Sequence, residues 1–521
     1  MPFDPDLPVG VDRRHFLKLA ASAAAATGLA PGAFGAGTLL GQERPPTAAG
    51  QEAPPPVPLG NGEPPAFAFQ AYPGGTGSLL EKMWREDGGS PFERSPFEVE
   101  PWSGPVPGAE EDVAFLPVHR LAALIRARHI SPTELTEIYL ERLKRYDPVL
   151  LCAVTILEGR GREEAQQAEA EIRAGQWKGP LHGIPWGVKD LFSVAGSPTT
   201  LGSADFQDQV IGEDAEVVRR MRAAGAVLIA KLSTGEFAQG DQWYRGRTNN
   251  PWNLEQGSSG SSAGPSSATA AACVAFGIGT ETQGSITSPA RRCGLSALRP
   301  TFGRVSRHGG MVLAWSMDKV GPICRSIEDC ALVFNTIHGA DEKDPSTLTT
   351  PFRFQRSPDL SALRIGFDED APEAFVEALR ALGANPQPIS GIPRGSSNAL
   401  NVESAAAFDF HIAPQIEAEE VAAAEIPPEE VVAGGAPSAE DRRRARFRRG
   451  REVSALDYLQ SQRRRHLLME EMAKVMEGFD MFVSGRGEIG LSNQTGHPAL
   501  VVPYDFGGDN PQPLTTTIIG G

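Results

Sequence analysis

Helical patterns alternate along this sequence with short runs of apolar or small residues. One helical pattern opens near Asp214, and the run 226–230 (Ala-Val-Leu-Ile-Ala) follows it after Gly225. The apolar positions of that helical pattern are Val217, Val218 and Met221. Further on, an Ala-rich helical pattern over 267–272 leads into the apolar run 274–278. Five-residue runs without polar alternation are typical of strands buried on both faces. The alternation therefore predicts an α/β fold built on a mixed β-sheet.

The residues from Ser131 to Glu134 carry the signals of a helix start. Ser131 is a preferred N-cap residue, Pro132 suits the first helical position, and Glu134 can reach back to the N-cap backbone. One face of the expected helix is apolar, with Leu135, Ile138, Tyr139 and Leu143 as its members. Asp147 and Pro148 predict the end of the helix, because proline disfavours helical geometry in the residue before it.

Composition excludes several classes of protein. With 40% hydrophobic residues in a chain of 521, a large core can be buried, which excludes general disorder. The 49 basic and 65 acidic residues give a net charge of −16, which argues against nucleic-acid binding. Five cysteines without a CxxC pair indicate neither a disulfide framework nor a zinc site. No run of 18 strongly apolar residues is present, which excludes a multi-span membrane protein.

A basic stretch over residues 441–449 is the feature that most favours nucleic-acid binding. It follows an acidic, Ala-rich stretch over 417–430, so its charges can pair locally. We interpret the basic stretch as one solvated face of a helix.

The first 43 residues have the pattern of a twin-arginine export signal. Arg13 and Arg14 precede a Phe-Leu-Lys step and a mildly apolar run rich in Ala and Gly. Residues 44–110 are rich in Pro and Gly, which is typical of an extended spacer. We therefore expect export of the folded protein to the periplasm or the extracellular space, without stable membrane insertion. The compact domain is expected over residues 111–521.

Three short segments carry the candidate chemistry. In the first, Lys189 lies among apolar residues and Gly, and burial would lower its pKa enough for it to act as a base. Taken alone, a Lys next to Asp190 is more typical of a surface ion pair. The second, 257–264, is a Gly/Ser run, either a flexible loop or a set of amides and hydroxyls held at a helix N-terminus. The third, 279–286, follows a buried run, and Gly284 lets its backbone approach a reacting carbonyl. The candidate oxyanion-hole N–H groups are those of Thr282, Gln283, Gly284 and Ser285.

A histidine-based site has less support. The sequence contains no GxSxG elbow, so an α/β-hydrolase triad lacks its main signal. A triad of Ser, His and Asp assembled from distant parts of the chain stays open.

In this order, the three segments resemble those of the amidase signature family, over roughly residues 112–521. The matching pieces are Gly-Ile-Pro before Lys189-Asp190, the Gly/Ser run, the loop ending at Ser285, and the segments 298–306, 318–322, 326–331 and 495–499. The resemblance implies the amidase signature fold, with a central mixed β-sheet flanked by helices on both faces. It also implies hydrolysis of a carboxylic amide bond through an acyl-enzyme intermediate, with no metal or organic cofactor.

The resemblance further implies the roles of the site residues. Ser285 is then the nucleophile, Lys189 the general base, and a serine of the Gly/Ser run the relay between them. The family places this relay 24 residues before the nucleophile, which gives 285 − 24 = 261 and favours Ser261 over Ser258. The expected partner is a small-molecule amide substrate.

Two departures from the family pattern bear on function. Thr287 stands where many members carry Arg, which indicates a change beside the pocket. The segment 403–409 lacks the Arg with which the A subunits of tRNA-dependent amidotransferases hold the glutamine carboxylate, so we expect a free-standing amidase. The alternatives are a glutamine-hydrolysing subunit of such an amidotransferase, and a catalytically inactive binding protein on the same fold.

The remaining expectations concern the substrate pocket, the C-terminal strands and assembly. Parts of 232–243 and 311–315 are expected to line the pocket and favour an apolar or aromatic acyl group. Residues 500–503 and 515–519 are expected to be core strands, and because family members continue further, we expect the chain to be truncated. The sequence does not determine the oligomeric state, and a homodimer is compatible with it.

Overall fold

The computed structural model describes residues 94–356, 358–395, 397–425, 439–485, 487, 489–507 and 512–521. The expected export signal and residues 44–93 of the expected spacer lie outside these residues. Residues 94–109 contain no helix or strand. They are fixed to the rest of the domain, because the Ser95 hydroxyl donates to the Phe352 carbonyl (2.9 Å) and Val99 is buried.

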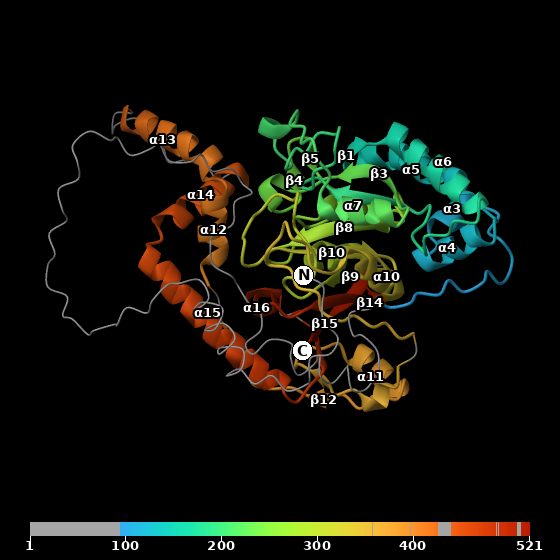
Figure 1. Ribbon diagram of the computed structural model, residues 1–521. Helices are drawn as coiled ribbons and strands as arrows, with labels where there is room; N and C mark the ends of the chain where they lie inside the picture. The colour runs from blue at the N-terminus through green and yellow to red at the C-terminus, as the bar shows by residue number, and fades with distance from the viewer. Residues whose placement is uncertain are drawn as a thin grey trace, which may run out of the picture. The chain divides into compact units, whose positions relative to one another are not determined.

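An eleven-stranded mixed sheet organises the domain (Figure 1). Its order is β1 (Ala153–Ile156), β3 (Val227–Leu232), β2 (Pro185–Lys189), β8 (Phe276–Glu281), β10 (Lys319–Cys324), β9 (Ser296–Arg299), β14 (Ala499–Gly507), β15 (Gln512–Gly520), β13 (Met481–Ser484), β11 (Ile365–Phe367) and β12 (Gln387–Pro388). Strand β2 pairs in parallel with β3 and β8, whereas β10 pairs antiparallel with β8 and β9. The predicted mixed sheet is therefore confirmed, and so are the predicted strands near 226–230, 274–278, 500–503 and 515–519.

Short hairpins and helices surround this sheet. The small strands are β4 (Gln242–Trp243), β5 (Gly246–Arg247), β6 (Asn249–Asn250) and β7 (Asn253–Gly257), paired β4–β5 and β6–β7. The helices are α3 (Glu110–Ala114), α4 (Val118–Arg126), α5 (Pro132–Leu150), α6 (Glu158–Arg173), α7 (Glu216–Ala223), α8 (Ala263–Ala270), α9 (Thr287–Cys293), α10 (Ile327–Ile337), α11 (Glu373–Ala381), α12 (Ala399–Ala407), α13 (Asp409–Glu425), α14 (Ala439–Glu452), α15 (Ala455–Met476) and α16 (Ile489–Thr495). Single 3-10 turns lie at Ala204–Phe206, Glu236–Ala238 and Leu360–Ala362. Among the described helices, none is both long enough and apolar enough to cross a membrane.

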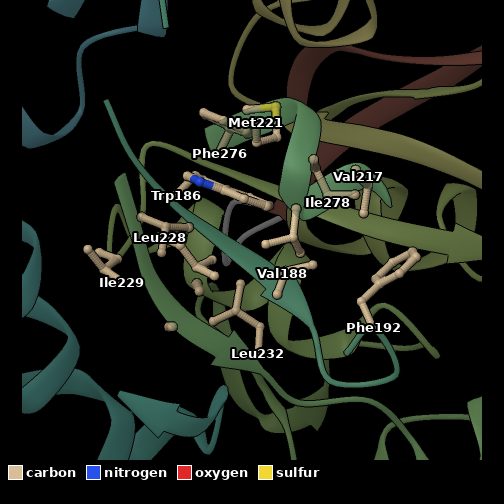
Figure 2. Packing of buried hydrophobic residues seen from close by; sticks show 14 of the residues in the cluster. Trp186, Val188, Phe192, Val217, Met221, Leu228, Ile229, Leu232, Phe276 and Ile278 are labelled. Carbon is tan, nitrogen blue, oxygen red and sulfur yellow. The ribbon is translucent and has the colours of Figure 1, made fainter. Parts of the chain in front are cut away.

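Helices pack on both faces of the sheet, as strand β8 shows. A Cβ atom at Gly277 would lie 2.9 Å from the Pro265 side chain, so only glycine lets α8 approach the strand this closely. Since side chains alternate along a strand, Phe276 points to the opposite face, where its ring stacks on Trp186 with centroids 5.9 Å apart. Met221 of α7 lies beside these rings (Figure 2). The prediction of a sheet flanked by helices on both faces is confirmed.

Helix α5 begins as its sequence predicts but ends later. The Ser131 hydroxyl accepts from the Glu134 N–H (3.1 Å), and the Glu134 carboxylate accepts from the Ser131 N–H (2.8 Å), which completes a capping box. The helix continues through Pro148 to Leu150, so the predicted stop at 147–148 was wrong. The last turn is closed instead by Leu151, whose left-handed backbone brings its N–H to the Asp147 carbonyl.

The helix that starts near Asp214 shows a smaller difference. Helix α7 begins at Glu216, and the Asp214 carboxylate does not cap it. That carboxylate accepts from the Ala195 N–H (2.9 Å) and pairs with Arg222. Asp214 therefore predicts the start of α7 to within two residues, but its side chain binds other segments and does not cap the helix.

The basic stretch at 441–449 forms part of helix α14, as predicted, but its described face is not fully solvated. Phe447 is buried, with its ring 5.7 Å from Phe408 and 6.4 Å from Phe237. Gly450 packs closely on α12, because a Cβ atom there would lie 2.1 Å from the Asn401 carbonyl oxygen. The single aromatic residue in the basic stretch is thus a packing residue that joins α14 to the domain.

Candidate active site

Lys189 ends strand β2 and is completely buried. Its ammonium nitrogen Nζ lies 2.7 Å from Ser261 Oγ and 2.9 Å from Thr280 Oγ1. Burial lowers the pKa of Lys189 to about 7, although the negative charges of Asp318 and Glu281 partly oppose this shift. Lys189 therefore has the burial and the hydroxyl neighbours that a base working near neutral pH needs.

The Gly/Ser run is an ordered turn that leads into helix α8. Ser258, Ser261 and Ser262 are fully buried, and the Gly260–Ser261 peptide bond is cis. Ser261 contacts Lys189, whereas the Ser258 hydroxyl donates to the Ser259 carbonyl (2.9 Å). Of the two candidate relay serines, the structure therefore brings Ser261 to the lysine.

Ser285 lies next to this run on the following loop. The N–H of Ser262 donates to the Ser285 carbonyl (2.9 Å), so the two loops are joined one residue beyond Ser261. Ser285 is 8% exposed, and among the described residues no histidine hydrogen-bonds to it. The structure thus gathers the segments of Lys189, Ser261 and Ser285 into one site.

The loop from Thr282 to Ser285 presents its backbone amides. Gly284 has φ +94°, a left-handed conformation that favours glycine, and its position faces Ile489. None of the four N–H groups at 282–285 donates a hydrogen bond to another described residue. These N–H groups are therefore available beside the buried Ser285, which is the first condition for the predicted oxyanion hole.

Glu281 holds the backbone of the two residues that follow Ser285. Its Oε2 atom accepts hydrogen bonds from the N–H groups of Ile286 and Thr287 (both 2.8 Å) and from the Thr287 hydroxyl (2.9 Å). Its Oε1 atom pairs with Arg299 (3.2 Å) and accepts from Asn493 (2.6 Å). Burial alone would raise the pKa of Glu281, but these partners lower it below its ordinary value.

The role of Glu281 was not recognised from the sequence, although the residue belongs to the loop motif. The partners Arg299 and Asn493 are far from it in sequence, so only the fold shows the contact. Thr287, the residue that departs from the family pattern, joins this network through its hydroxyl.

Asp318 is the second carboxylate that the sequence did not single out. Its Oδ1 atom accepts from the Thr282 hydroxyl (2.6 Å), and its Oδ2 atom accepts from the N–H groups of Leu313 (2.8 Å) and Ala314 (3.1 Å). One carboxylate therefore ties the candidate oxyanion loop to the segment 311–315, which the sequence placed at the substrate pocket.

Asp190, next to Lys189 in sequence, belongs to a different pair. It is buried with Lys231, with 2.8 Å between Lys231 Nζ and Asp190 Oδ1, and it also accepts from the Thr200 N–H (3.0 Å). Lys189 and Asp190 are therefore not partners of each other, which leaves the Lys189 amine to the two hydroxyls.

Glu403, in the segment 403–409 that contains no Arg, and Arg465 of α15 both bind Ser316. Glu403 accepts from the Ser316 N–H (2.8 Å), and Arg465 of α15 donates to the carbonyls of Ser316 (3.0 Å) and Gln494 (2.7 Å). This buried guanidinium holds the loop that contains Asp318.

A family model described as Amidase matches residues 134–485, which is more than half of the chain and spans all three chemical segments. The chain belongs to the amidase family. The amidase signature resemblance is thereby confirmed, because Lys189, Ser261 and Ser285 all lie inside the matched range.

Relatives and solved structures agree with the placement of this chain in the family. The A subunit of the glutamyl-tRNA(Gln) amidotransferase of Roseiflexus sp. (strain RS-1) is 39% identical over 286 residues, which cover 51% of this chain and 58% of that protein. The protein AmiD of Mycobacterium bovis is 38% identical over 285 residues, which cover 52% of this chain and 60% of that protein. The chain thus spans less than two thirds of the length of these curated relatives.

Two solved structures are similar to this chain over most of its length. The native peptide amidase from Stenotrophomonas maltophilia has a TM-score of 0.65 and 27% identity, covering 78% of this chain and 93% of that one. A bacterial aryl acylamidase of the amidase signature family has a TM-score of 0.67 and 22% identity, covering 79% and 93%, which shows the shared fold.

Proposed function

We propose that this protein is an amidase that hydrolyses a carboxylic amide bond with Ser285 as nucleophile, Ser261 as relay and Lys189 as general base. The observation that carries the proposal is the 2.7 Å contact between the buried Lys189 amine and the Ser261 hydroxyl. The pKa of about 7 supports it, because a substantial fraction of Lys189 is then neutral at neutral pH.

In the acylation step, a proton moves along the three side chains as a bond forms at carbon. Ser285 Oγ attacks the amide carbon and gives its proton to Ser261 Oγ, whose own proton passes to Lys189 Nζ. The carbonyl electron pair moves to oxygen, and the amides of residues 282–285 stabilise the resulting oxyanion. Each such donor contributes roughly 3–4 kcal/mol of transition-state stabilisation.

Breakdown of the tetrahedral intermediate reverses the proton path. Lys189 returns a proton through Ser261 to the leaving nitrogen, the C–N bond breaks, and a neutral amine or ammonia departs. Water then attacks the ester of Ser285, and its proton passes to Lys189 through Ser261. As the tetrahedral intermediate collapses, Lys189 returns that proton through Ser261 to Ser285 Oγ, and the carboxylic acid departs. These steps balance with water as the only co-reactant.

Serine variants test the assignment. Ser285→Ala and Ser261→Ala should each lower kcat for hydrolysis of primary amides by at least about 1000-fold, since the members of such a unit act together. Ser258→Ala is the matched control, because Ser258 donates to its neighbour's carbonyl, and it should keep kcat within about tenfold of wild type. Full activity in the Ser285 variant would refute the assignment.

The 39% identity to the A subunit of a glutamyl-tRNA(Gln) amidotransferase favours one second candidate, a glutamine-hydrolysing subunit of a larger complex. Ammonia release from glutamine, together with co-purification of other subunits, would support it. Hydrolysis of simple amides by the isolated chain without glutaminase activity would instead support the free-standing enzyme.

A further inference from the structure

A cavity of about 520 Å³ lies beside the Lys189 end of strand β2. Leu191 is part of its wall, and the Leu191 N–H donates to the Lys189 carbonyl (2.8 Å). Met311, a second wall residue, donates its N–H to the Leu191 carbonyl (2.9 Å), so the two segments lie side by side. Lys189, Ser261 and Ser285 are not in the wall themselves, and Leu191, two residues after Lys189, is the wall residue that joins the cavity to the end of β2.

The wall of this cavity is largely apolar and partly aromatic. Its apolar members include Leu191, Leu201, Phe206, Met311, Trp315 and Phe410. Small-molecule sites in proteins commonly enclose about 300–1,000 Å³ and are lined mainly by apolar and aromatic side chains. The size and the lining of this cavity match that description.

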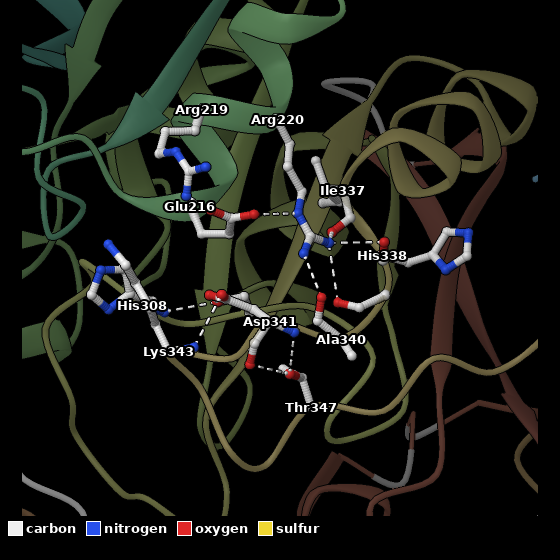
Figure 3. A network of polar contacts seen from close by, with 12 residues as sticks. Glu216, Arg219, Arg220, His308, Ile337, His338, Ala340, Asp341, Lys343 and Thr347 are labelled. Carbon is white, nitrogen blue, oxygen red and sulfur yellow. Dashed lines mark hydrogen bonds and ion pairs between the residues drawn. The ribbon is translucent and has the colours of Figure 1, made fainter. Parts of the chain in front are cut away.

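The charged residues of the lining are already paired with one another. Glu213 lies 3.8 Å from His308 and 3.5 Å from Lys343, and Arg307 pairs with Asp344 at 2.9 Å. Figure 3 shows His308 and Lys343 directed at the same carboxylate. Because these charges offset one another, the lining favours a neutral group over an ionised one.

The wall is also mechanically joined to the proposed oxyanion loop. Asp318 holds the backbone of Leu313 and Ala314 through one oxygen and the Thr282 hydroxyl through the other. A group seated against Met311 and Trp315 therefore lies on the segment that Asp318 ties to the reacting loop.

We propose that this cavity is the subsite for a large apolar, preferably aromatic, group of the amide substrate. The inference rests on the proposed function, because it treats the cavity as a part of that site. Residues 311–315 were expected at the pocket and line this cavity through Met311, Val312 and Trp315, whereas no residue of 232–243 lies in its wall.

Two series of substrates test the proposal and locate the group relative to the scissile bond. One series is primary amides R–CO–NH₂, and the other is acetamides CH₃–CO–NH–R, with R growing from methyl to 2-naphthyl. In one series kcat/KM should rise at least tenfold from the smallest to the largest group. The series that responds identifies the acyl or the amine side as the occupant of the cavity.

A variant that fills the cavity tests whether the cavity causes the preference for large groups. Met311→Trp should lower the naphthyl-to-methyl ratio of kcat/KM at least tenfold. Leu382→Trp, at an exposed position after α11, is the matched control and should leave that ratio unchanged. A flat substrate series, or an unchanged ratio in Met311→Trp with hydrolysis intact, would overturn the proposal and leave the proposed function standing.

Measurements of ligand binding test the proposed subsite independently of the proposed hydrolysis. The affinities of 2-naphthamide and of N-(2-naphthyl)acetamide for the Ser285→Ala and wild-type proteins are measured calorimetrically, with and without Met311→Trp. At least tenfold weaker binding of the preferred ligand in both Met311→Trp proteins supports the subsite even if no amide is hydrolysed, in which case only the proposed function fails. Equal binding with and without Met311→Trp would overturn the subsite.

Discussion

The chemistry of Lys189 depends on its surroundings more than on its residue type. A lysine in water keeps its proton to high pH, whereas burial lowers the pKa of Lys189 to about 7. The amine contacts two hydroxyls, and the neighbouring Asp190 is engaged by Lys231. Burial without a directly paired carboxylate is thus what makes this lysine a candidate base.

The pH dependence of the reaction follows from that pKa. Lys189 acts as a base only when neutral, so kcat/KM should rise about tenfold per pH unit below about pH 7 and level off above it. A pH–rate profile with a neutral amide as substrate measures this change of kcat/KM with pH. Lys189→Arg, which stays protonated, should be inactive across the range, and a flat wild-type profile between about pH 6 and 8 would contradict the role.

Glu281 and Arg299 form a completely buried pair under the reacting loop. Glu281→Ala should lower the free energy of unfolding by about 3–5 kcal/mol, because it removes the carboxylate that faces the buried guanidinium. Urea denaturation measures the change. Glu281→Gln keeps the shape and one oxygen acceptor, so it should cost less, and equal stability of wild type and Glu281→Ala would contradict this account.

At the residue scale, the sequence predicted residues that lie in local motifs and missed roles that depend on distant contacts. The segments of Lys189, Ser261 and Ser285 are brought together as expected, although the catalytic roles of these residues remain predictions. The tasks of Glu281 and Asp318 depend on partners such as Asn493 and Leu313, which no local pattern connects to them. The available signal was that Glu281 and Asp318 both lie in segments that resemble those of the family.

Elements were predicted best where the signal is local. The capping box of α5 lies within four residues and formed as expected. The end of α5 was misjudged because Pro148 sits in the last turn, where the helix is closed by the backbone of Leu151. Packing of α14 through Phe447 was missed because its aromatic partners lie on other elements.

The capping box gives a test at the scale of the element. Ser131→Ala should lower the free energy of unfolding by about 1 kcal/mol, because the Glu134 N–H loses its acceptor. Ser131→Asp keeps an acceptor and should retain most of that stability. Chemical denaturation of the three proteins measures their free energies of unfolding. Equal denaturation midpoints for wild type and Ser131→Ala would contradict the prediction.

For the whole molecule, the sequence predicted the α/β class and the mixed sheet, because buried runs and helices alternate along the chain. It did not predict the order of eleven strands, in which β2, β8 and β10 are neighbours although they are distant in sequence. That order brings the Lys189 end of β2 next to the Ser285 loop after β8. The site is therefore a product of sheet topology as much as of motifs.

The N-terminal sequence contains the predicted export signal, which concerns the whole protein. Changing Arg13 and Arg14 to Lys should abolish export of the full chain from a bacterium with a twin-arginine pathway, because that pathway reads the paired arginines. Cell fractionation with an antibody against the folded domain measures the outcome. Arg44→Lys, the same change of residue type outside the paired arginines, is the control and should leave export unaltered. Export of the double variant at the wild-type level would refute the signal.

The most direct test of the central claim is the intact mass of the purified protein after incubation with a fluorophosphonate. We expect a single adduct on wild type, no adduct on Ser285→Ala, slower labelling of Lys189→Ala, and wild-type labelling of Ser258→Ala. An unlabelled wild-type protein, or an adduct that persists in Ser285→Ala, would contradict an activated serine at position 285.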